Sequence, residues 1–94
     1  MNSEYIITCK CGEIDEKARA GFSVLFPDRP VPQIIKHENI HKFLSSLPRD
    51  WRFVSYVGDN LIKNKNKFAY YFLVSDKGNI LAMYNLLKGK KVAV

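Results

Sequence analysis

The chain has 94 residues, of which 47% are apolar and 13% aromatic, and it carries a formal net charge of +6. This length leaves no room for a second domain, so we expect one domain over residues 1–94 with its own hydrophobic core. No stretch approaches the roughly 20 consecutive apolar residues that cross a bilayer, and the first residues lack an apolar signal segment, which predicts a soluble cytoplasmic protein without a membrane partner.

The N-terminal part of the sequence predicts a strand followed by a helix. The stretch EYIITCK alternates in polarity and is rich in Ile and Thr, as strands are. EIDEKARA contains good helix formers, with Gly21 as a possible end of the helix. The next stretch, FSVLF, fits a short strand or a continued helix; we favour the longer helix because Ile14, Ala18, Phe22 and Leu25 recur at helical spacing.

The rest of the chain predicts a connector, a second helix and three strands. PDRPVP holds three prolines and cannot be regular structure. QIIKHENIHKFLSSL has helical spacing and stops at Pro48, whereas WRFVSYV, KFAYYFLVS and NILAMYNLL have strand composition, with a DKG turn between the last two. The predicted fold is a small α+β domain with the element order β-α(-α)-β-β-β, an antiparallel sheet and helices against one face.

One short motif raises the question of a metal site. His37, Glu38 and His41 form the His-Glu-x-x-His pattern with which zinc peptidases place two ligands and a catalytic base on one helix. Lys36 and Lys42 flank the motif, no third ligand follows, and helical phase puts the histidines on the flank and outer side of their helix. We expect surface histidines, no metal and no cofactor, and a zinc-dependent peptidase is the least favoured function.

The two cysteines, Cys9 and Cys11, are too close in sequence for a relaxed disulfide with each other. Strand alternation puts them on one face, so we expect reduced and half-buried side chains. A thiolate paired with His37 or His41 is an alternative that the spacing does not specifically support.

Positive charge is concentrated in the C-terminal half, since residues 1–41 have a net charge of −1 and residues 42–94 one of +7. A DKG turn centred between Lys77 and Gly78 pairs each residue i with residue 155 − i. The expected partners are Leu73 with Ala82, Tyr71 with Tyr84, Lys67 with Lys88, and Lys65 with Lys90. The end of the hairpin away from its turn then gathers six lysines: Lys63, Lys65, Lys67, Lys88, Lys90 and Lys91.

Like charges that face each other across a sheet are destabilising unless solvent or an anionic partner screens them. Two interpretations follow. The lysines either protect a strand edge from aggregation and keep the protein soluble, or they bind phosphates or an acidic protein surface.

Tyrosines accompany these lysines at Tyr70, Tyr71 and Tyr84. Their strands are apolar on both faces, yet two helices cover only one face of a sheet. We therefore expect the second face to be covered by a homodimer partner, by another protein, or by single-stranded bases stacked on tyrosine rings.

These observations predict a small basic binding module without catalysis that acts on nucleic acid or on an acidic protein surface. A protein inhibitor that occupies a partner's nucleic-acid site would share these features. The element order and charge are also similar to those of the ribosome-dependent messenger-RNA-cleaving toxins, which implies a small ribonuclease as a further alternative. No motif of that family matches residue by residue, so no catalytic residue is carried over.

Overall fold

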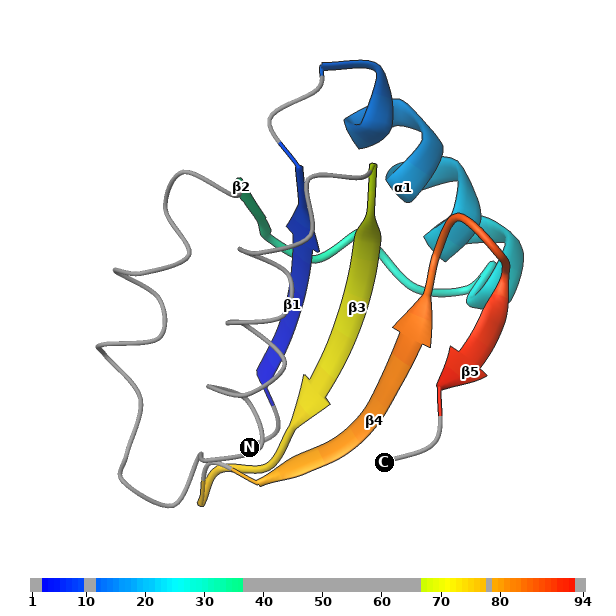
Figure 1. The fold of residues 1–94 in the computed structure, drawn as a ribbon. Coiled ribbons are helices and arrows are strands. Elements are labelled where there is room, and N and C mark those ends of the chain that lie inside the picture. The colour runs from blue at the N-terminus through cyan, green and yellow to red at the C-terminus, as the bar shows by residue number, and fades with distance from the viewer. Residues whose placement is uncertain (1–2, 10–11, 37–66, 78, 93–94) are drawn as a thin grey trace.

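The computed structural model describes residues 3–9, 12–36, 67–77 and 79–92. In these ranges five strands form a mixed sheet with the order β2-β1-β3-β4-β5, and one helix packs against it (Figure 1). The elements are β1 (Ser3–Thr8), α1 (Gly12–Leu25), β2 (Ile34–Lys36), β3 (Ala69–Val74), β4 (Ile80–Asn85) and β5 (Lys90–Val92). The α+β class is confirmed, and the sheet is mostly antiparallel with one parallel pair, β1 with β2.

Helix α1 confirms the favoured alternative for the N-terminal helix, which is the longer one that continues past Gly21. Glu13 and Asp15 occupy its first turn, where carboxylates interact favourably with the positive end of the helix dipole. Ile14, Ala18 and Phe22 follow at four-residue spacing, and all three are buried against the sheet. The helix ends at Leu25, just before Pro27, whose missing N–H and ring stop it from continuing.

Strand β2 corrects the sequence prediction, which placed Ile34–Lys36 at the start of a second helix. The three residues pair in parallel with Ile6–Thr8 of β1, and the Ile6 N–H donates to the Gln33 carbonyl at 2.9 Å. Two consecutive isoleucines suit a pleated edge, and pairing satisfies backbone groups that would otherwise remain open along β1. The other residues of the predicted helix, and the strand predicted at 51–57, lie outside the described ranges.

Strands β3 and β4 form the hairpin that the sequence predicts. The structure pairs Tyr71 with Tyr84 and Leu73 with Ala82, as expected, and the register shifts by one residue only beyond Leu73. Ser75 and Asn79 close the turn through two bonds: the Ser75 N–H donates to the Asn79 carbonyl, and the Asn79 N–H donates to the Ser75 hydroxyl.

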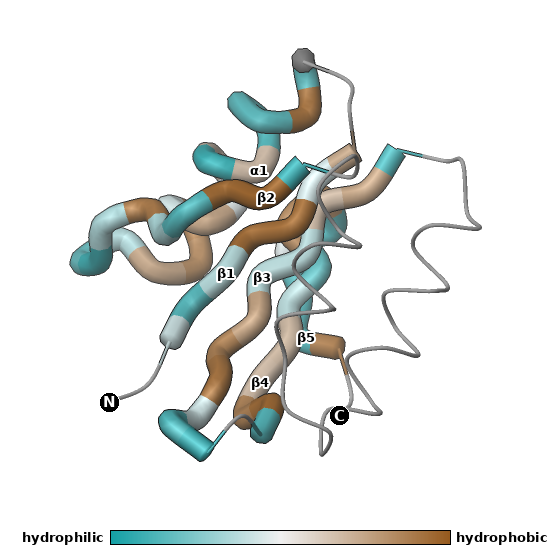
Figure 2. Tube along the Cα trace, turned by 90° about the vertical axis from the view of Figure 1, so that its left-hand side faces the viewer, coloured by the Kyte–Doolittle hydropathy of each residue, from teal (hydrophilic) through white to brown (hydrophobic). Residues whose placement is uncertain are grey.

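The side of the sheet that faces α1 holds an aromatic cluster. The Phe22 ring lies 5.0 Å from that of Tyr71, and Phe26, just after the helix, lies 5.3 Å from Tyr71 and 5.1 Å from Tyr84. Tilted and edge-to-face contacts of this kind add to the gain from burying the rings. Figure 2 shows α1 on one side of the sheet, and the contacts between these rings stabilise that packing.

The opposite face of the sheet is also buried within the chain, which corrects the expectation that a separate partner molecule must cover it. Ile7, Phe72, Val74 and Met83 alternate with the residues that face α1, and none of the four is more than 5% exposed within the single chain. An open apolar face was the reason for predicting a homodimer. That reason is removed, and the homodimer stays a prediction without structural support. In the described part of the chain, no helix has both the length and the apolar character needed to cross a membrane.

Candidate functional site

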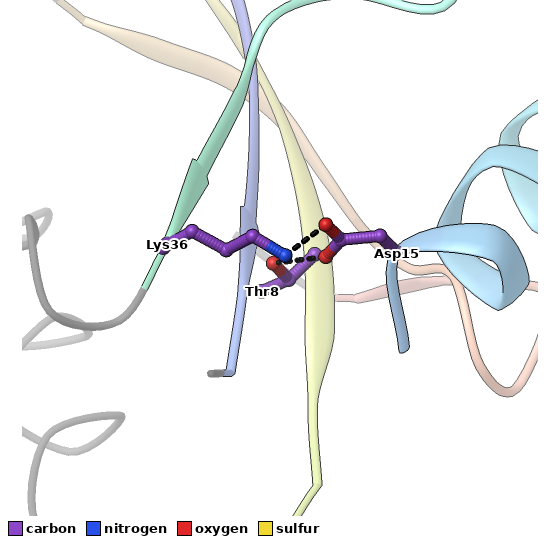
Figure 3. A network of polar contacts seen from close by, with 3 residues as sticks. All are labelled: Thr8, Asp15 and Lys36. Carbon is purple, nitrogen blue, oxygen red and sulfur yellow. Dashed lines mark hydrogen bonds and ion pairs between the residues drawn. The ribbon is translucent and has the colours of Figure 1, made fainter. Parts of the chain in front are cut away.

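Two polar clusters lie on the α1 side of the sheet, and the first joins three elements (Figure 3). Asp15 of α1 accepts a hydrogen bond of 3.0 Å from the hydroxyl of Thr8, the last residue of β1, and pairs with the ammonium of Lys36 at the end of β2. Thr8 is fully buried, so its hydroxyl needs this acceptor. The cluster fixes α1 over the parallel pair and leaves the Lys36 charge neutralised, so we assign it a structural role.

The second cluster surrounds Arg29, in the connector after α1. Its guanidinium pairs with Glu4 of β1 and lies over the Phe26 ring, 5.4 Å from the ring centre. The hydroxyl of Tyr71 is buried nearby and makes no hydrogen bond of normal geometry with the described residues. Burial raises the pKa of Tyr71 above its ordinary value, and the positive charge of Arg29 opposes that rise in part.

Replacing Tyr71 with phenylalanine should leave the free energy of unfolding near neutral pH within about 1 kcal/mol of wild type, because the hydroxyl makes no hydrogen bond of normal geometry with the described residues. Above the ordinary tyrosine pKa of 10.0, the unfolded phenol loses its proton while the buried phenol keeps it. The unfolded state is then favoured, so wild type should lose up to about 1.4 kcal/mol per pH unit more than the variant. Urea unfolding over a series of alkaline pH values measures this, and parallel stability curves would contradict it.

The predicted lysines fall into two groups where the structure describes them. Lys88, Lys90 and Lys91 belong to the β4–β5 turn and to β5, and all three are exposed. Lys67 lies just before β3, with its ammonium 3.9 Å from the carboxylate of Glu13 on α1. Both partners of that pair are largely exposed, so it adds little stability. Lys63 and Lys65 lie outside the described ranges.

The β4–β5 turn corrects the predicted register at the lysine end of the hairpin. Leu86 still follows the ladder, since its N–H donates to the Ala69 carbonyl at 3.0 Å, but the chain then reverses. The Asn85 side-chain oxygen accepts the N–H groups of Leu87 and Lys88, both at 3.1 Å, and Gly89 adopts a φ of 64°, which favours glycine.

The reversal creates β5, which the sequence analysis did not predict. Lys90 pairs with Asn85 and Lys91 with Tyr84, and no ladder pair among the described residues joins Lys67 to Lys88. The expected pair of Lys90 with Lys65 involves a residue outside the described ranges. The three lysines instead line the outer edge of the described sheet. We name Lys88, Lys90 and Lys91 the basic edge.

The predicted tyrosines do not form one stacking surface. Tyr71 is 1% exposed, so its ring is inaccessible to a base, and we remove it from the predicted binding residues. Tyr84 is half-buried on the same face and contacts Phe26. Tyr70 is half-buried on the opposite face, beside Phe68.

A surface pocket of about 360 Å³ opens between α1 and the β4–β5 turn. We name it the α1–turn pocket, and its lining residues are Ile14, Lys17, Ala20, Lys67, Leu86 and Leu87. Figure 1 shows the end of β4, the turn after it and α1 at one corner of the molecule. The pocket joins Lys67, which the sequence analysis selected, to Lys17, which it missed because the two are 50 positions apart in the chain.

The described residues offer no support for the metal and thiol hypotheses, and most of the residues concerned lie outside them. The described residues contain no group of three or more His, Cys, Asp or Glu side chains placed to hold a metal ion. His37, Glu38, His41 and Cys11 lie outside those residues, and Cys9 is a buried cysteine directly after the end of β1. The zinc motif therefore stays untested.

Comparisons with protein-family models, curated proteins and solved structures found no match. The basic edge and the α1–turn pocket are the features of the described residues that bear on function.

Proposed function

We propose that this chain is a small binding module without catalysis that binds an anionic macromolecule through its basic edge. The observation that carries the proposal is the setting of Lys88, Lys90 and Lys91: all three are exposed on one turn and one edge strand, and none forms an ion pair with a described carboxylate. Charges of one sign gathered in this way repel each other unless an anion screens them.

The turn holds this charge in a defined place. The two N–H bonds to Asn85 and the ladder pairs between β4 and β5 fix the backbone of all three lysines. Positions fixed in advance reduce the conformational entropy lost when a partner binds. Protection of the strand edge from aggregation would need the charges but not a particular partner, so binding measurements separate the two interpretations.

Nucleic acid and an acidic protein surface both fit the basic edge, and salt dependence distinguishes direct phosphate contacts. Replacing Lys88, Lys90 and Lys91 together with alanine should lower the salt slope for nucleic acid by about 2 to 3, because each neutralised phosphate contributes about 0.7 for a single strand and 0.9 for a duplex. The measurement is a salt titration with short single-stranded RNA, duplex DNA and poly-glutamate.

Lys77→Ala is the matched control, because Lys77 is an exposed lysine in the β3–β4 turn at the other end of the hairpin. It should change the slope by less than about 1. If wild type binds none of the three polyanions at low salt, or if the control acts as strongly as the triple change, the proposal is wrong.

Two alternatives use the same charges. An inhibitor would cover the nucleic-acid site of another macromolecule, and a ribonuclease would cut the RNA that it binds. Incubating the protein with end-labelled RNA and resolving the products on a denaturing gel tests the ribonuclease directly, because a binding module leaves the RNA intact.

A further inference from the structure

We propose that the α1–turn pocket binds an apolar side chain carried by an acidic peptide segment, and hence that the partner is a protein. This inference rests on the proposed function and narrows it from an anionic macromolecule to one class.

The walls of the pocket are aliphatic. Ile14, Ala20, Leu86 and Leu87 contribute its apolar surface, and its volume of about 360 Å³ lies within the range that binds small organic groups. No aromatic ring is among the described residues that line it. Bases bound without sequence preference depend on stacking against aromatic side chains, so these walls suit a branched aliphatic side chain better than a base.

Positive charge surrounds those walls. Lys17 and Lys67 line the pocket, and Lys88 directly follows Leu87 in the chain. Among the described ion pairs, Glu13 takes part in the one with Lys67, at 3.9 Å, and it is itself 82% exposed, so a partner's carboxylate can take its place. A segment with one apolar residue between acidic ones therefore matches the pocket in both shape and charge.

The pocket is built on fixed backbone. Gly21 of α1 packs directly against the Leu86 carbonyl, and the Leu86 N–H is bound to Ala69 at the start of β3. Asn85 fixes the next two residues of the turn. The walls need little ordering when a side chain enters, which favours affinity from a small contact.

Exposed apolar surface continues beyond the pocket. Leu87 is 38% exposed, and Val24, which is 79% exposed, lies one helical turn after Ala20 on the same flank of α1. A peptide anchored in the pocket can extend along this flank with a second apolar residue. A charged phosphate backbone would gain no binding free energy from contact with these apolar side chains.

Fluorescence anisotropy with two capped peptides tests the inference. One carries a single leucine between two runs of glutamate, and the other has alanine at that position, so their charges are equal. Wild type should bind the leucine peptide about tenfold more tightly, because the pocket buries the additional methyl and methylene groups.

Leu87→Ser should reduce this preference to about threefold or less. Leu81→Ser is its matched control, because Leu81 is 48% exposed on β4 and does not line the pocket; the tenfold preference should persist. Lys17→Ser should weaken both peptides, whereas Lys77→Ser should weaken neither.

The outcomes also separate this inference from the proposed function. Equal affinity for the two peptides, or tight binding of RNA without binding of either peptide, overturns the pocket inference and leaves the binding module standing. A failure to bind peptides, RNA, DNA and poly-glutamate at low salt overturns both.

Discussion

Replacing Phe22 with alanine should lower the free energy of unfolding by about 3 to 5 kcal/mol, which is the largest effect we expect from a single change. The Phe22 ring is fully buried and contacts Phe26 and Tyr71, both at 5.0 Å between ring centres. Its removal leaves a cavity between α1 and the sheet that rigid strands cannot close. Urea unfolding followed by circular dichroism measures the loss.

Val24→Ala is the control for this prediction, because Val24 lies on the same helix and is 79% exposed. It should change the free energy of unfolding by no more than about 0.5 kcal/mol. Equal losses for the two variants would falsify the assignment of the Phe22 side of α1 to the core.

Elements whose signal lies in their own sequence were predictable. β1 has strand composition, the hairpin of β3 and β4 adds a turn signal to it, and α1 repeats its apolar residues at the helical period. The hairpin register followed from the position of the turn, which is why Tyr71 and Tyr84 were paired correctly.

The two short edge strands could not be predicted, because the signal for them does not lie in their own sequence. β2 and β5 have three residues each, too few to show a period, and they exist because β1 and β4 offer backbone groups to pair with. The isoleucines of β2 were assigned to a helix that continues the same apolar spacing. β5 lies in a lysine-rich stretch without strand composition. The chain reversal that precedes β5 depends on both Asn85 and Gly89.

The candidate site shows the same limit. Lys67, Lys88, Lys90 and Lys91 could be selected from charge alone, and the structure places the last three along one edge. The pocket could not be foreseen, because it requires Lys17 on α1 and Leu87 in the β4–β5 turn to lie together near Lys67, just before the start of β3. A local sequence pattern carries no information about contacts between segments that lie far apart in the chain.

Replacing Gly21 with alanine should destabilise the protein by about 1 to 3 kcal/mol, although alanine in place of glycine usually stabilises a helix interior by about 1 kcal/mol. The sign reverses because an added Cβ would overlap the carbonyl oxygen of Leu86 and lie 3.1 Å from its carbonyl carbon. Both are backbone atoms, so the helix or the turn must move. Thermal and urea unfolding measure the change.

Ser23→Ala is the matched control, because Ser23 is exposed on α1 and the same substitution by alanine should stabilise the helix slightly, by up to about 0.5 kcal/mol. A second readout locates the strain: the amide of Leu86 should exchange with solvent faster in Gly21→Ala, because its bond to the Ala69 carbonyl holds the same turn. A gain in stability with unchanged exchange would show that α1 and the turn are not in contact. Since Leu86 lines the α1–turn pocket, a displacement of its backbone changes the shape of the pocket, and the variant should also lose much of the preference for the leucine peptide.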